Sequence, residues 1–407
     1  MTGLRAAVRW LQEASLYLLI LLLPFSKASI ELTFAGLFFG WLFARLDPAT
    51  RRDSLWHRPA LRTLLAVLTG YLAVCALSIA VSRYPGTSLK GFVGKWLQYL
   101  LFTVVIADVA LHPAVVKRSL RVFAAAALFV VFEAVTQERY GNGFFRNFRL
   151  DFYFRMTGPY ENPIDLATYL MVVIPILLAV VLTRAWRARW PLLALLAALV
   201  VCLVRTESLG AWLGLGIGLL MMSVMSRAVR RYGVLLLVAA SLIGAGSLIR
   251  RHRLAKVASW SEIGKTDRIA MWTSALRMIQ DRPILGHGVN TFMANYLSYW
   301  VGGEQQPRYA HNCYLQVAAE TGLIGLALFA WLLGLLFYHL YAACHRLGSK
   351  ERLILLGLFG GLLAFAAQAA LDTNFYAMRQ AALFWMVAGL ALGISQWKPN
   401  SSLSANR

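Results

Sequence analysis

The chain has 407 residues, of which 59% are hydrophobic and 14% charged, and its mean hydropathy is +0.62. Soluble domains are less apolar and carry more charge, so these values exclude an ordinary soluble protein and favour a membrane protein. The formal net charge of +22 would suit a nucleic-acid-binding protein. However, the basic residues lie in short loops and form no contiguous face, so no nucleic-acid partner is expected.

Apolar segments recur along almost the whole chain. A helix that crosses a bilayer needs about 20 mostly apolar residues, and the sequence therefore predicts an all-α integral membrane protein with about twelve transmembrane helices. Residues 1–407 are expected to form a single polytopic membrane domain. The predicted helices span residues 13–27, 30–46, 62–82, 92–111, 116–135, 163–183, 190–205, 208–226, 232–249, 312–342, 352–371 and 378–396.

Basic residues cluster in alternate loops. Cytoplasmic loops of membrane proteins are enriched in Lys and Arg, so this alternation predicts that both termini are cytoplasmic. The two long connections, 136–162 and 250–311, then lie on the opposite face, which we call the outward face. The clusters are Arg45, Arg51, Arg52, Arg58 and Arg62; Lys117, Arg118 and Arg121; Arg184, Arg187 and Arg189; Arg227, Arg230 and Arg231; and Arg346, Lys350 and Arg352.

No metal or cofactor is expected on the outward face. Its acidic residues show no paired-carboxylate spacing such as Asp-x-Asp, which a bound divalent cation would favour. The four cysteines are isolated, and no pair has the spacing of a metal or redox site. The cysteines are Cys75, Cys202, Cys313 and Cys344, and the outward acidic residues include Glu138, Asp151, Glu161, Glu262, Asp267, Glu304 and Asp372.

The connection 250–311 contains two predicted amphipathic helices. Apolar residues recur at helical spacing from Arg268 onward, and the Asp-Arg-Pro segment 281–283 should end this first helix. A turn at 286–288 leads to a second, aromatic stretch. Such helices often lie along the membrane surface, where they would cover a cavity above the bundle. The apolar residues are Ile269, Trp272, Leu276 and Ile279 in the first helix and Phe292, Tyr296, Leu297 and Trp300 in the second.

His311 and Asn312, at the start of the tenth predicted helix, give the strongest chemical signal. The positive end of the helix dipole favours a neutral imidazole, and a neutral histidine can serve as a general base. Both residues would equally suit an ordinary helix cap. Glu320 lies about 13 Å deeper at helical rise. It must face the bundle interior, either in an ion pair with an arginine or in a direct catalytic role.

Two outward arginines, Arg205 and Arg268, could hold a phosphate group, because guanidinium pairs well with phosphate oxygens. The alternatives are snorkelling to the interface for Arg205 and a solvated loop charge for Arg268. Trp272 lies one turn after Arg268, on the same helix face. The candidate substrate-binding residues are Trp272, Asn312, Glu161 in the turn 158–163, Lys27 at the first outward turn and Asp372 at the last outward turn. Lys27 and Asp372 would also suit ordinary interface positions.

Together these segments resemble the O-antigen ligase and O-antigen polymerase superfamily, over residues 160–330. The matching stretches are Arg268 with Trp272, Pro283-Ile284-Leu285-Gly286-His287-Gly288, Ala310-His311-Asn312 with Leu315, and Glu320-Thr321-Gly322-Leu323-Ile324-Gly325. Weaker matches are Asn162-Pro163 with Leu166-Ala167 and the segment 206–212, where the family often has arginine after the serine and this chain has Leu209.

The resemblance implies a glycosyltransferase of the GT-C type in the bacterial inner membrane, with its active site on the periplasmic face and residues 250–311 as the large periplasmic loop. It implies an O-antigen ligase of lipopolysaccharide biosynthesis, which transfers a glycan from undecaprenyl diphosphate to a sugar hydroxyl of the lipid A core. His311 matches the family's loop histidine, while Arg268, and less closely Arg205, match its periplasmic arginines. We expect a metal-independent displacement with inversion, in which His311 is the base and the arginines hold the diphosphate.

Three alternatives remain open from the sequence. An O-antigen polymerase would use the same donor but a second lipid-linked glycan as acceptor. A protein O-oligosaccharyltransferase is another member type of the superfamily. A lipid-linked glycan transporter would need polar residues along a path through the bundle, whereas the ionisable residues of this chain gather on the outward face.

Overall fold

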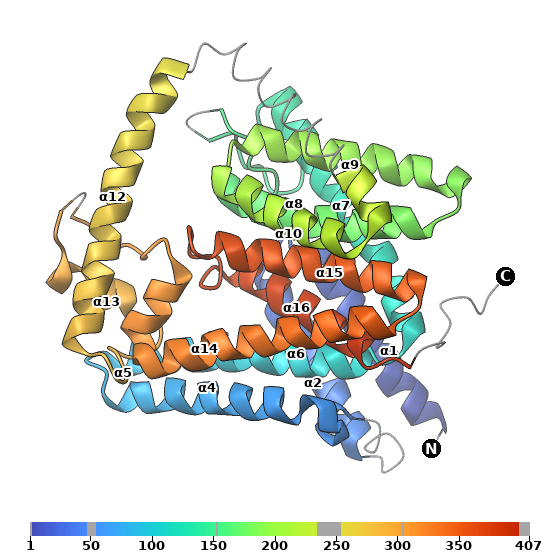
Figure 1. The fold of residues 1–407 in the computed structure, drawn as a ribbon, viewed down its shortest axis with the longest axis horizontal. Coiled ribbons are helices and arrows are strands. Elements are labelled where there is room, and N and C mark those ends of the chain that lie inside the picture. Colours follow the sequence, from blue (N-terminus) through green and yellow to red (C-terminus); the bar gives the residue numbers. More distant parts are fainter. Residues whose placement is uncertain (1, 47–53, 152–153, 234–253, 303–304, 399–407) are drawn as a thin grey trace.

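The computed structural model describes residues 2–46, 54–151, 154–233, 254–302 and 305–398. In these ranges every regular element is a helix, and no strand occurs (Figure 1). The helices are α1 (Thr2–Leu22), α2 (Lys27–Leu46), η1 (Leu55–His57), η2 (Pro59–Leu61), α4 (Arg62–Ala80), α5 (Pro85–Gly91), the π-helix η3 (Phe92–Leu97), α6 (Gln98–Val109), α7 (Pro113–Tyr140), α8 (Pro163–Thr183), α9 (Trp186–Thr206), α10 (Leu209–Met225), α12 (Leu254–Asp281), α13 (Phe292–Tyr296), η4 (Leu297–Tyr299), α14 (Cys313–Arg346), α15 (Ser349–Gln368) and α16 (Met378–Ser395).

Nine helical segments within the described ranges are long and apolar enough to cross a membrane. The prediction of a helical, multi-pass membrane protein is therefore confirmed. The nine segments are α2, residues Pro59–Ala80 with α4, residues Pro85–Val109 with α5, η3 and α6, and the helices α7, α8, α9, α14, α15 and α16.

The predicted number of twelve transmembrane helices stays a prediction. Helix α1 has 21 residues, but Arg5, Arg9 and Glu13 make it more polar than the nine. Helix α10 is apolar but has only 17 residues. The ninth predicted helix, 232–249, lies almost entirely outside the described residues.

Local sequence signals set several helix ends. Helix α7 starts with Pro113 and is followed by Gly141 in the left-handed conformation, with φ 84°, which glycine adopts without strain. At the start of α8 the Asn162 side chain accepts a hydrogen bond from the backbone N–H of Ile164. Such a cap satisfies a helix-end donor that would otherwise lack a partner.

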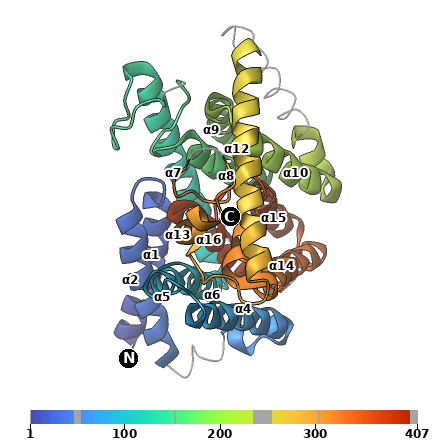
Figure 2. The same ribbon diagram turned by 90° about the vertical axis from the view of Figure 1, so that its left-hand side faces the viewer.

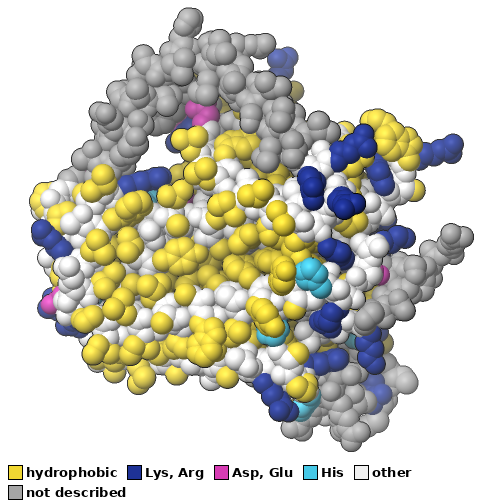
Figure 3. All heavy atoms as spheres, viewed as in Figure 1, with side chains coloured by type: hydrophobic (Ala, Val, Ile, Leu, Met, Phe, Trp, Pro, Cys, Tyr) yellow, Lys and Arg dark blue, Asp and Glu magenta, His cyan; other side chains and the backbone are white. Residues whose placement is uncertain are grey.

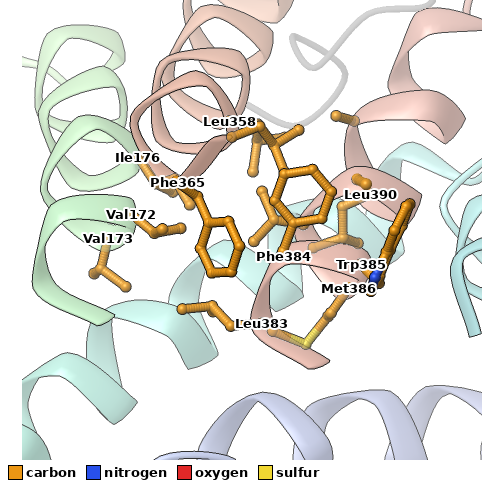
Figure 4. Close-up of a cluster of buried hydrophobic side chains, with 14 of the residues drawn as sticks. Val172, Val173, Ile176, Leu358, Phe365, Leu383, Phe384, Trp385, Met386 and Leu390 are labelled. Atoms are coloured by element: carbon orange, nitrogen blue, oxygen red, sulfur yellow. The ribbon is translucent and has the colours of Figure 1, made fainter. Parts of the chain in front are cut away.

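The centre of the bundle is formed by α8, α15 and α16, whose facing side chains are buried (Figure 4). The ring centroids of Phe365 in α15 and Phe384 in α16 lie 4.9 Å apart, and Phe384 meets Trp385 edge-on. Val172 and Ile176 of α8 complete this cluster. Between helices in a bilayer there is little hydrophobic driving force, so close van der Waals packing of this kind holds them together.

Small residues let α15 approach both α8 and α10 closely. A Cβ atom added at Gly218 of α10 would lie 2.3 Å from the carbonyl oxygen of Gly360, and one at Gly361 would lie 2.6 Å from that of Val172. Larger residues would therefore separate these helices. Glycine at helix crossings is a common feature of membrane bundles.

Helix α12 lies across one end of the bundle (Figures 1 and 2). Figure 1 shows the spanning helices running side by side with α12 crossing them, and Figure 2 shows α12 over the helix ends. Helices α5 and α13 lie at this same end. Lys and Arg side chains gather at the opposite end, where α1 begins and α16 ends, and a broad apolar band lies between the two ends (Figure 3). We refer to the end with α12 as the outward end.

Helix α14 is interrupted at Gly322, and the segment 283–288 fits into the break. Gly322 has φ 72° and ψ −178°, a backbone conformation that is essentially restricted to glycine. The interruption exposes backbone groups of α14, and three hydrogen bonds satisfy them. The bonds are His287 N to Ala319 O (3.0 Å), Gly288 N to Glu320 O (2.9 Å) and Leu323 N to Pro283 O (2.7 Å). We call this arrangement the α14 clasp.

Gly322→Ala should strongly destabilise the protein. The backbone conformation alone costs a non-glycine residue on the order of 1–3 kcal/mol, and the added Cβ would lie 2.0 Å from the carbonyl oxygen of Ile284. Thermal unfolding of the detergent-solubilised protein measures the effect. Gly334→Ala on the same helix is the control, because nothing lies within 4 Å of a Cβ there. Equal, small effects of the two substitutions would contradict the clasp.

Candidate active site

His311 lies just before α14 at the outward end of the bundle. Asn312 is the helix cap, since its side-chain oxygen accepts hydrogen bonds from the backbone N–H groups of Tyr314 and Leu315 at 3.0 and 3.1 Å. His311 therefore stays outside the helix, in a left-handed conformation with φ 47°. Its side chain is 34% exposed, so a substrate can reach the imidazole.

Asp372 orients the His311 imidazole. Nδ1 of His311 lies 3.3 Å from Oδ1 of Asp372, which belongs to the turn 369–377 between α15 and α16. The first residue of α14, Cys313, donates its backbone N–H to the carbonyl oxygen of Ala369 at 2.8 Å and so fixes the helix start against this turn. When Nδ1–H faces the carboxylate, Nε2 remains to accept a proton, which is the arrangement of a general base.

A buried arginine, Arg379, joins three segments at the outward end. Its guanidinium donates hydrogen bonds to the carbonyl oxygens of Pro24 and Pro159, at 2.9 and 3.0 Å. It also lies over the ring of Tyr160, 4.4 Å from the centroid, where the attraction between cation and aromatic ring adds to the binding. Arg379 thus joins the start of α16 to the turns before α2 and α8.

Charged residues from four elements meet around Asp165, at the start of α8. Arg379, Asp372, Glu161 and Lys27 all act electrostatically on its carboxylate. Nζ of Lys27 and Oε1 of Glu161 are 4.0 Å apart, and both side chains are about 60% exposed. Such an exposed pair adds little stability. Because both side chains are largely exposed, both groups are accessible to a substrate.

Arg205 lies in the last turn of α9 and forms an ion pair with Glu138 near the end of α7. Its side chain is 19% exposed, and its backbone carbonyl accepts a hydrogen bond from Met156 N at 3.0 Å. The side chain therefore has a carboxylate partner, which the sequence did not predict. A phosphate ligand at this position would have to compete with Glu138.

Arg268 and Trp272 lie on α12. The preceding residue, Asp267, has a carboxylate oxygen 3.6 Å from the guanidinium of Arg308, which joins α12 to the segment that leads into His311. No acidic side chain in the described part of the chain pairs with Arg268. The indole Nε1 of Trp272 is buried without an acceptor. Both groups could donate hydrogen bonds to a bound anion or hydroxyl.

The sequence left two alternatives for Glu320, and the first of them, an ion pair with an arginine, does not occur among the residues that the structure describes. Glu320 is fully buried, and its carboxylate accepts four hydrogen bonds, two of them from backbone N–H groups of the segment 290–292. These donors offset the cost of removing a charge from water. Glu320 is thus part of the α14 clasp. The donors are Asn290 N (2.6 Å), Phe292 N (3.1 Å), Gln316 Nε2 (3.2 Å) and Tyr376 OH (3.0 Å).

The predicted site residues fall into separate groups. No hydrogen bond or ion pair in the described ranges joins Arg205 or Arg268 to His311. The groups are His311 with Asn312 and Asp372; Lys27 with Glu161, beside Asp165; Arg268 with Trp272 on α12; and Arg205 at the end of α9.

The sequence indicated no role for Asp165, which interacts electrostatically with both Asp372 and Lys27, or for Arg379, which also acts on Asp165. Both lie at the outward ends of predicted transmembrane helices. A charged side chain at such a position is costly unless it has a partner or a function, and this cost was the signal that could have identified them.

The fold and this arrangement define a helical membrane protein with a charged, partly exposed site at one end of its bundle. The family model described as O-antigen ligase matches residues 194–330, which include α10, α12 and the first half of α14. The match supports an O-antigen ligase-like protein, of the ligase and polymerase type. No curated protein matches the chain. Of the predicted site residues, the matched region contains Arg205, Arg268, Trp272, His311 and Asn312.

A second histidine of the outward end, His287, is part of the clasp and is buried. Its Nε2 lies 3.0 Å from the carbonyl oxygen of Met278, to which Nε2–H donates. Burial lowers the pKa of the imidazole below its ordinary value of 6.5. The hydroxyl of Tyr299 donates to Asp281 at 2.6 Å and lowers the pKa of that carboxyl. The folded clasp therefore favours a neutral His287.

The pH dependence of stability should reflect His287. Because the pKa is lower in the folded than in the unfolded state, the stabilising contribution is complete above the unfolded-state pKa of 6.5 and is lost as the pH falls from there through the lower pKa of the folded state. The melting temperature should therefore fall as the pH decreases below about 6.5, and less so in His287→Gln. His57→Gln, at an exposed histidine, is the control. An unchanged decrease in His287→Gln would refute the assignment.

Proposed function

We propose that this protein is an O-antigen ligase, which transfers a glycan from undecaprenyl diphosphate to a sugar hydroxyl of the lipid A core. The observation that carries the proposal is the pair formed by His311 and Asp372 at the start of α14, where His311 belongs to the region that matches the family. Both substrates are lipid-linked, so the reaction needs a site that opens at the membrane surface. The start of α14, a spanning helix, meets this requirement.

His311 is the general base in this proposal. Its Nε2 takes the proton of the acceptor hydroxyl while the hydroxyl oxygen attacks the anomeric carbon of the donor. The bond between this carbon and the diphosphate oxygen breaks, and the diphosphate leaves with the bonding electrons. Attack opposite the leaving group inverts the anomeric configuration. The Asp372 carboxylate stabilises the imidazolium that forms.

Arg268 and Arg205 bind the diphosphate. Guanidinium groups bind phosphate oxygens in a bidentate manner and stabilise the charge that grows on the leaving group. The lack of an acidic partner for Arg268 among the described residues supports this role, and Arg205 would exchange Glu138 for phosphate. The remaining substrate-binding residues are Lys27, Glu161, Asn312, Asp372 and Trp272.

The outward end faces the periplasm in this proposal, and both termini lie on the cytoplasmic side of the bacterial inner membrane. The gathering of Lys and Arg at the opposite end of the bundle (Figure 3) supports this orientation, because basic residues are enriched on the cytoplasmic side. The segment 250–311 then belongs to the periplasmic loop that covers the site.

His311→Ala should reduce ligation about 10²- to 10⁴-fold, the usual contribution of a positioned base. Asp372→Asn should reduce it less, because the imidazole remains but loses its anionic partner. Transfer of labelled glycan to lipid A core by the purified enzyme measures both. His345→Ala, at an exposed histidine in the last turn of α14, is the control. Near-normal ligation by His311→Ala would rule out the base assignment.

Disruption of the gene distinguishes a ligase from a polymerase. If the protein is a ligase, polymerised glycan should accumulate on undecaprenyl diphosphate while the lipid A core stays uncapped. Electrophoresis of lipopolysaccharide and analysis of the lipid-linked glycan measure both products, and the wild-type gene should restore the capped form. Single repeat units attached to the core would instead identify a polymerase.

A further inference from the structure

The connection between α7 and α8 concentrates arginines. Residues 139–155 contain four arginines and one acidic residue, Asp151, which is paired with Arg155 at 2.7 Å. The other three arginines are exposed, and no acidic side chain in the described ranges pairs with them. They are Arg139, Arg146 and Arg149. We call residues 139–155 the arginine loop.

A buried carboxylate fixes the backbone of the arginine loop. Glu133 of α7 is fully buried and accepts hydrogen bonds from the backbone N–H groups of Phe145 and Arg146, both at 2.8 Å. Gln137, also buried, donates to the carbonyl oxygen of Phe148 at 3.0 Å. Because buried polar groups are stable only when they are hydrogen-bonded, these two side chains fix the backbone of residues 145–148.

The tip of the arginine loop rests on the outer side of α7. The ring of Phe145 lies 6.0 Å from those of Phe129 and Phe132, and Phe144 lies 5.8 Å from Phe132. All four rings are more than 40% exposed. Exposed phenylalanine rings on a spanning helix suit contact with lipid. Arg146, next to Phe145 in the chain, therefore lies close to a surface that suits lipid.

The arginine loop adjoins one of the proposed site residues. Glu138, which precedes Arg139, forms the ion pair with Arg205, and Met156, directly after the loop, donates to the carbonyl oxygen of Arg205. A lipid bound at the loop would thus lie beside Arg205. The loop thus has exposed guanidinium groups and exposed aromatic rings, and it lies next to Arg205.

We propose that the arginine loop binds phosphate groups of the acceptor lipid, a phosphorylated glycolipid, and so docks the acceptor beside the site. The identification of the bound lipid as the acceptor rests on the proposed function. Phosphate is the expected ligand because its charge is opposite to that of the loop and because exposed guanidinium groups bind phosphate oxygens strongly. The exposed rings of Phe144 and Phe145 keep these groups beside an apolar surface that suits lipid.

The test is equilibrium binding of bisphosphorylated lipid A to the purified full chain in neutral detergent, without any donor. The variant R139Q/R146Q/R149Q should bind at least about tenfold more weakly, since basic residues near an anionic lipid surface each add to the attraction. The lysine variant R139K/R146K/R149K, which keeps the charge, should retain most of the binding. The control variant is R184Q/R187Q/R189Q, in the connection between α8 and α9 at the opposite end of the bundle. It should leave binding unchanged.

Two results would overturn the inference. One is equal binding of lipid A from which the phosphates have been removed, and the other is displacement of lipid A by an equal amount of phosphatidylglycerol, which would make the loop a general anionic anchor. Because the assay contains no donor, it is independent of catalysis. Phosphate-dependent binding without transfer would refute the proposed function alone, whereas normal transfer with phosphate-independent binding would refute this inference alone.

Discussion

The hydrogen bonds that bury Glu320 organise the outward end of this protein. A carboxylate inside a membrane bundle needs several donors, and two of its four come from backbone N–H groups at Asn290 and Phe292. The break at Gly322 makes this possible, because it lets the segment 283–288 enter the helix. The clasp thus provides hydrogen-bond partners for backbone groups of α14, and it ties the covering segment to the bundle at a fixed position.

The start of α14 is fixed by contacts of its own. His311 lies ahead of a helix whose first turn is capped by Asn312 and whose first residue is bonded to the turn after α15. The imidazole therefore meets Asp372, a residue 61 positions later. A site assembled in this way combines the rigidity of spanning helices with a position at their ends, where lipid-linked substrates can arrive from the bilayer.

The α7–α8 connection uses a comparable device. Glu133 is a buried carboxylate on a spanning helix and accepts two backbone N–H groups from the loop that follows, as Glu320 does for the segment 290–292. In both cases the low polarity of the surroundings strengthens the hydrogen bonds. In each case a buried acidic side chain therefore helps to hold an outward segment in place.

The sequence by itself determined the class of protein and most of its helices, because the length and polarity of a membrane span are strongly constrained by the bilayer. It also indicated His311, Asn312 and the arginines as candidate site residues, since polar residues beside apolar segments are rare and therefore informative. The sequence could not determine the partners of Glu320, because these partners lie on a distant loop. Nor could it identify Arg379 as the link between turns far apart in the chain. Such pairings arise only when the helices pack, and only the tertiary structure decided them.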